Sequence, residues 1–152
     1  MNARVVIAFF SVGVLSASAF LLVTASPLLS RGVPGIESMP MGTLIAWLGI
    51  VALPLGIYSA LGGLHPPRRA VDRATSAIMK ALLTLAVAWV PISYGLSGNL
   101  AFTFERNAGF RGSENALFCF FYGTIGLVLA PLVVMLLYGA ASWLSRGKDA
   151  RP

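Results

Sequence analysis

The chain has 152 residues, of which 57% are hydrophobic and 11% are charged, and its mean hydropathy is +0.83. Soluble domains average about 45–50% apolar and about 25% charged residues, so this composition excludes an ordinary water-soluble domain. The formal net charge is +6. In so apolar a chain, the anionic headgroups of membrane lipids account for this charge more simply than nucleic acid does, and we expect lipids as the partner.

Four long apolar segments predict four transmembrane helices, since about 20 apolar residues cross the hydrocarbon core of a bilayer. We expect an all-α integral membrane protein in which residues 1–152 form one membrane domain, a four-helix bundle. The expected spans are about 5–26, 41–64, 77–97 and 116–144.

The first segment also has features of a signal peptide, because residues 16–19 are small, as at a cleavage site. The apolar run continues through Phe20–Val23, which favours a retained anchor. Cys119 is the single cysteine, which excludes an internal disulfide and a CxxC pair.

Basic residues are unevenly divided between the two sides of a four-span chain. One side carries eight and the other three, and arginine and lysine near span ends tend to stay in the cytoplasm. We therefore expect a bacterial inner-membrane protein with both termini in the cytoplasm. The eight are Arg4, Arg68, Arg69, Arg73, Lys80, Arg146, Lys148 and Arg151; the three are Arg31, Arg106 and Arg111.

Pro54, Pro91 and Pro131 each fall inside a predicted span, where a proline removes a backbone hydrogen bond and bends the helix. Nearby hydroxyls are expected to satisfy the freed carbonyls; the candidates are Ser59, Ser93 and Thr124. The kinks either enclose a cavity or hinge or simply allow a small bundle to pack, and the second interpretation is favoured because no polar lining accompanies them.

Small residues at four-residue spacing predict faces on which helices pack closely. The second span carries such a strip, in which Gly56 and Ala60 follow Ala52. The other spans have one pair each, and all are expected to face the interior rather than a dimer interface. The pairs are Gly13 and Ala17, Ala77 and Ala81, and Gly126 and Ala130.

Tryptophan and tyrosine residues lie mostly toward span ends, where aromatic rings anchor a helix at the level of the lipid headgroups. We expect this role for Trp47, Tyr58, Trp89, Tyr94, Tyr122, Tyr138 and Trp143.

A basic stripe leads into the third span, and its predicted role is contact with anionic lipid, although an acidic cytosolic protein is an alternative. The stripe consists of Arg68, Arg69, Arg73 and Lys80. His65 is the only histidine, which argues against a haem or zinc site built by this chain alone, and no cofactor is expected.

The loop from Gly98 to Asn115 contains three phenylalanines, which do not sit freely in water. It can lie among headgroups, cap the bundle, or contact another protein through aromatic and arginine side chains. We predict partner-binding residues here, with Glu105–Arg106 and Arg111–Glu114 as local ion pairs. The predicted set is Phe102, Phe104, Glu105, Arg106, Phe110, Arg111 and Glu114.

No acid lies inside a predicted span, which disfavours small multidrug exporters and other proton-coupled carriers. Residues 104–106 and 114–115 resemble the Glu-Arg…Asn-x-x-Glu element of membrane-bound glutathione transferases. That element follows the first helix in the family and includes an arginine–histidine portion missing here, so the resemblance implies no functional residue.

The favoured function is non-catalytic contact with another membrane protein. The chain would be an accessory or assembly subunit of a larger complex, or an immunity protein against a membrane-targeting toxin. Small bacterial immunity proteins are similar in outline. The alternative is an oligomeric channel or small-solute carrier lined by hydroxyls such as Ser11, Ser18, Thr84 and Ser93.

Overall fold

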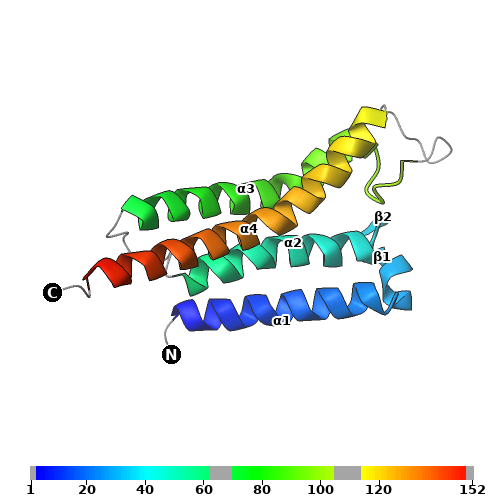
Figure 1. Cartoon of the computed structure of the whole chain (residues 1–152). Helices are drawn as coiled ribbons and strands as arrows, with labels where there is room; N and C mark the ends of the chain where they lie inside the picture. The colour runs from blue at the N-terminus through cyan, green and yellow to red at the C-terminus, as the bar shows by residue number, and fades with distance from the viewer. Residues whose placement is uncertain (1–2, 62–69, 105–113, 150–152) are drawn as a thin grey trace.

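The computed structural model describes residues 3–61, 70–104 and 114–149 (Figure 1). These residues form four helices that are long and apolar enough to cross a membrane. They are α1 (Ala3–Val23), α2 (Met41–Ala60), α3 (Ala70–Ser97) and α4 (Glu114–Asp149). The prediction of an all-α protein with four spanning-length helices is confirmed.

Each helix runs antiparallel to the one before it in the chain (Figure 1). The starts of α1 and α3 therefore lie at the same end of the molecule as the C-terminal ends of α2 and α4. We call this end the terminal end. The opposite end, which carries the connections after α1 and α3, is the hairpin end.

Several helix boundaries differ from the predicted span ends: α2 ends at Ala60 rather than 64, and α4 covers Glu114–Asp149 rather than 116–144. The third helix begins at Ala70, before the predicted Ala77, so its first turns include the charged residues that hydropathy alone had placed outside. The first helix ends at Val23 because Ala25 takes a left-handed backbone, with φ of 46°, and the Ser26 amide donates to Leu21 O at 3.1 Å. This pattern ends many helices.

The connection after α1, residues 24–40, contains a short helical turn and two strands that the sequence analysis did not predict. A 3₁₀ turn, η1 (Pro27–Ser30), is followed by the antiparallel strands β1 (Gly32–Val33) and β2 (Ile36–Pro40). Gly35 supplies the left-handed position that this tight turn requires, with φ of 85°.

The apolar core lies between α2, α3 and α4. Toward the terminal end, Ile57 and Tyr58 of α2 pack with Met79 of α3. Toward the hairpin end, Ala86 and Trp89 of α3 pack with Leu127 of α4. The first helix packs mainly against α2 and lies at the side of this core (Figure 1).

Glycine faces serine along the contact between α1 and α2. A Cβ atom on Gly56 would lie 3.0 Å from Ser11 Cβ, and one on Gly49 would lie 3.1 Å from Ser18 Cβ. The two glycines are seven residues apart on α2, and the two serines are seven residues apart on α1. Seven residues are about two helix turns, so each pair lies along one face of its helix. We call these four residues the Gly–Ser seam; they allow the two backbones to approach closely.

The other small-residue predictions fare unevenly. Ala52 is buried, whereas Ala60 at the end of α2 is exposed. The predicted packing faces of the remaining helices are wrong in part, because a Cβ atom on Gly13 or Gly126 would meet nothing within 4 Å. Ala17, Ala77 and Ala81 are likewise exposed.

Each helix continues through its internal proline. Pro54 and Pro131 are fully buried, whereas Pro91 is exposed. The prediction that hydroxyls satisfy the carbonyls freed by these prolines is wrong. Ser59 Oγ donates to Gly56 O and Thr124 Oγ1 to Phe120 O, while Ser93 Oγ has no partner among the described residues.

Candidate interaction site at the hairpin end

Residues 99–104, which we call the cap segment, follow α3 and are held by the side chain of Asn99. The Asn99 Nδ2 group donates to Thr103 O at 2.8 Å and to Ser97 O at 3.2 Å. Its Oδ1 atom accepts from the Thr103 amide at 3.0 Å and from Thr103 Oγ1 at 3.2 Å. One asparagine thus closes the segment on itself, a common function of this residue in turns.

The cap segment is also tied to two helices. Thr43 Oγ1, at the start of α2, donates to Leu100 O at 3.0 Å. Ser97 Oγ, at the end of α3, lies 2.8 Å from Asn99 O and is buried. These contacts fix the backbone of the segment relative to both helices.

Aromatic packing ties the cap segment to α4. The Phe120 ring lies 5.6 Å from the Phe102 ring and 5.1 Å from the Phe104 ring, measured between centroids. These tilted arrangements are favourable for aromatic pairs. Phe102 also adopts φ of 53°, which a large side chain rarely does, so packing and hydrogen bonds hold it in a costly conformation.

Trp47 and Trp89 contribute to this arrangement from within the bundle, so their predicted role as headgroup anchors is wrong, whereas Trp143 is exposed near the end of α4. Trp89 is buried, stacks 6.4 Å from Phe120, and donates from Nε1 to Thr124 Oγ1 at 3.0 Å. Trp47 Nε1 donates to Ala86 O at 3.0 Å. Their indole N–H groups are satisfied by protein acceptors, so neither ring needs an interfacial position.

Only part of the predicted partner-binding set lies in the described residues. Phe102 and Phe104 are partly buried, and Glu114 is exposed in the first turn of α4, where a negative charge suits the helix dipole. The remaining four and their predicted ion pairs lie outside the described residues; they are Glu105, Arg106, Phe110 and Arg111.

Phe120 was not predicted as part of this site. The run Phe118-Cys119-Phe120-Phe121 gives no sign of which ring faces inward, because every residue in it is compatible with lipid. The structure leaves Phe118 and Phe121 exposed and turns Phe120 toward the cap segment.

The described part of the basic stripe lies toward the terminal end, away from the cap segment. Arg73 and Lys80 are on α3 and exposed, whereas Arg68 and Arg69, like His65, lie outside the described residues. Two tyrosines at this end make interior contacts. Tyr58 Oη lies 3.3 Å from Ser76 Oγ, and Tyr138 Oη donates to Asp72 Oδ1 at 3.1 Å.

The hydroxyls predicted for a solute path are dispersed. Ser11 and Ser18 lie in the Gly–Ser seam, while Ser93 is buried on α3. Thr84 is exposed and donates to Lys80 O at 2.9 Å. Within the described residues, no group of three histidine, cysteine or acidic side chains is arranged to hold a metal ion.

Comparison with known proteins gives no relative: no family model, no curated protein and no solved structure matches the chain.

Proposed function

We propose that this chain is a multi-pass protein of a bacterial inner membrane that acts by contact with another membrane protein, without catalysis. It would serve as an accessory or assembly subunit of a larger complex, or as an immunity protein against a membrane-targeting toxin. The recognition surface is the hairpin-end loop, residues 102–115.

The observation that most supports this proposal is the strained backbone conformation in which the cap segment is held. The backbone of Phe102 lies in a region that costs about 1–3 kcal/mol for a non-glycine residue, yet contacts from three helices maintain it. These contacts also fix the point at which the rest of the loop begins, relative to α2, α3 and α4.

A loop whose first residues are already fixed favours recognition, because less conformational entropy is lost when it binds a partner. Phe102 and Phe104 direct part of their rings to Phe120 and remain partly exposed. Aromatic and arginine side chains contribute most of the binding energy in many interfaces. In this proposal, the two phenylalanines set the position of the segment that carries Arg106 and Phe110.

The proposed orientation has both termini in the cytoplasm. Among the described residues, Arg4, Arg73 and Lys80 belong to the helix portions nearest the terminal end, while Arg31 and Glu114 belong to the hairpin end. The positive side therefore coincides with the end at which α1 begins and α4 ends, which is the expected cytoplasmic side.

The test is capture of a partner from native membranes by the tagged protein and by a variant carrying Phe104→Ala, Arg106→Ala and Phe110→Ala. We expect partner recovery to fall by at least about tenfold while insertion and helical content are unchanged, since hot-spot truncations each cost about 2 kcal/mol or more.

A matched control removes two exposed phenylalanines at the terminal end, Phe9→Ala and Phe10→Ala, which are 75% and 71% exposed. Recovery should stay at the wild-type level in this control. Equal recovery with the control and with the loop variant would refute the recognition surface.

A further inference from the structure

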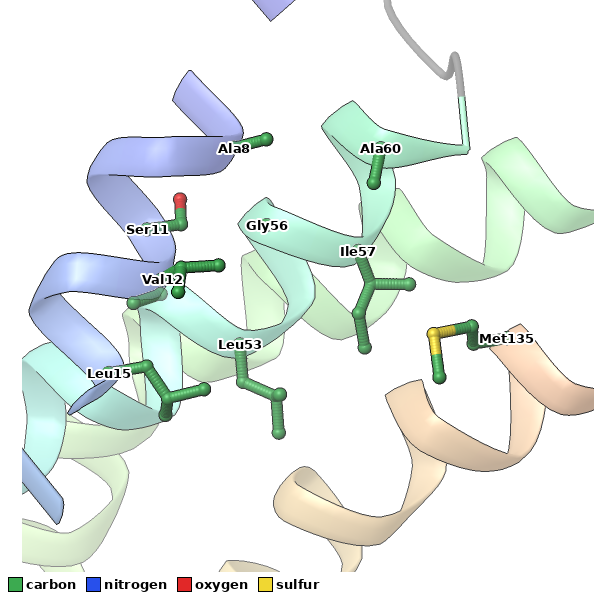
Figure 2. Close-up of a pocket in the computed structure, with 10 residues that line it drawn as sticks. Ala8, Ser11, Val12, Leu15, Leu53, Gly56, Ile57, Ala60 and Met135 are labelled. Atoms are coloured by element: carbon green, nitrogen blue, oxygen red, sulfur yellow. The ribbon is translucent and has the colours of Figure 1, made fainter. Parts of the chain in front are cut away.

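An apolar groove opens between α1, α2 and α4 near the terminal end, with a cavity volume of about 190 Å³ (Figure 2). Its walls come from three helices that are far apart in the sequence. Ser11 and Gly56 of the Gly–Ser seam are among its lining residues. The walls are Ala8, Val12 and Leu15 of α1, Leu53 and Ile57 of α2, and Met135 of α4.

A cation lies on the same face of α1, one turn beyond the groove. Residues four and seven positions apart share a helix face, so Arg4 is in line with Ala8 and Ser11. The Arg4 side chain is partly exposed, and its Nε atom is buried without a hydrogen-bond partner among the described residues. A charged group with a buried, unpaired donor is costly, and an anion beside the exposed part of the guanidinium would offset part of that cost by its charge.

An apolar groove with a cation near its end indicates the chemistry of the occupant. A molecule that matches both features has an acyl chain and a negatively charged headgroup. We propose that this groove binds one acyl chain of an anionic glycerophospholipid, with the phosphate at the guanidinium of Arg4.

The dimensions of the groove suit a chain better than a protein helix. The lining residues of α1 run from Ala8 to Leu15, over which the helix rises about 10 Å at 1.5 Å per residue, so the groove takes a segment of one acyl chain. A helix with side chains is about 10–12 Å across, much wider than a single acyl chain, so a cavity of about 190 Å³ suits the chain better.

This inference is independent of the proposed partner surface, which lies at the hairpin end. It also differs from general attraction of lipid by the basic stripe, because it names one cation and one groove. Arg73 provides the comparison: it is an exposed arginine near the terminal end, on α3, and it does not line the groove.

The experiment reconstitutes the purified protein in phosphatidylcholine vesicles containing phosphatidylglycerol and counts retained phospholipids by intact mass after gentle extraction. We expect one phosphatidylglycerol molecule to be retained preferentially by the wild type. The Arg4→Gln variant should weaken this retention about fivefold, as expected for the loss of one basic residue near an anionic lipid. The Arg73→Gln control should change it far less.

A second variant tests the groove without changing charge. Ala60 lines the groove and is exposed, so Ala60→Leu fills space without disturbing the core. It should lower retention of the same lipid, whereas Ala17→Leu, on an exposed position outside the groove, should not. Equal loss in the two arginine variants, or full retention by Ala60→Leu, would show bulk attraction alone and overturn the proposal.

Discussion

The indole Nε1 atom of Trp89 on α3 donates a hydrogen bond to Oγ1 of Thr124 on α4, across 3.0 Å. The same threonine hydroxyl donates to Phe120 O at 2.8 Å, so it both accepts from α3 and donates within α4. The indole ring in turn stacks near Phe120, which receives the cap segment. Packing between α3 and α4 therefore continues directly into the contacts that hold the candidate interaction site.

Gly123 is predicted to be essential for this contact. A Cβ atom at Gly123 would lie 2.1 Å from Trp89 Cη2, so the indole must move if any side chain is added. We expect Gly123→Ala to lower the free energy of unfolding by about 1–3 kcal/mol, as overpacking does. Thermal unfolding in detergent, followed by tryptophan fluorescence, measures the change.

The matched control is Gly126→Ala, on the same helix, where an added Cβ would meet nothing within 4 Å. This variant should be as stable as the wild type or slightly more stable, because alanine favours helix. Similar loss in both variants would mean that helix flexibility, and not contact with Trp89, explains the effect.

The Gly–Ser seam gives a second prediction. Gly56→Leu places a large side chain against Ser11 and should separate α1 from α2, destabilising the protein by at least about 1–3 kcal/mol. Gly13→Leu adds the same side chain to the exposed face of α1 and should have little effect. Unfolding in a denaturing detergent distinguishes the two, and a seam variant as stable as its control would contradict the packing.

Asn99 is predicted to fix the cap segment. Asn99→Ala removes the acceptor of the Thr103 amide, and a typical net hydrogen bond contributes about 1 kcal/mol. We therefore expect hydrogen exchange at this amide to accelerate about fivefold. Thr103→Val removes only the hydroxyl bond and should accelerate it less; unchanged exchange in Asn99→Ala would exclude this role.

Orientation is tested with a reporter that is active only in the periplasm. Fused after Pro152, it should remain silent; fused after Phe104, at the hairpin end, it should be active. The reason is the excess of basic residues on the terminal side. Activity from the C-terminal fusion would reverse the proposed topology.

Four apolar segments were sufficient to predict the four helices, because spanning length and hydropathy are local properties of the chain. Helix ends were harder to predict. The helix α3 begins at Ala70, within a polar stretch. Hydropathy gives no information about such a boundary, because polar residues also form helical hydrogen bonds. The left-handed turn at Ala25 also gave no signal, since it involves no glycine.

The packing faces could be predicted only in part, because four-residue spacing of small residues does not say which side of a helix meets a neighbour. Gly56 lies against Ser11, but Gly13 faces outward. Serine was the informative partner in α1, and its small side chain was missed. Tryptophan was misassigned for a related reason: the acceptors of Trp47 and Trp89 lie 39 and 35 residues away in the chain.

For the candidate site, the composition of the loop was informative and its geometry was not. Three phenylalanines indicated that the loop packs against something. That Phe102 and Phe104 both meet Phe120 depends on the tertiary arrangement of α3 and α4, which local sequence does not encode.

The central claim is that this protein acts by contact with a different membrane protein. The most direct measurement is gentle detergent extraction of the tagged chain from native membranes, followed by mass determination of the intact assembly. The account predicts a foreign subunit in fixed stoichiometry with the chain. Recovery of the chain alone, or of a homo-oligomer alone, would contradict it and direct attention to flux through liposomes as the measure of a channel or carrier.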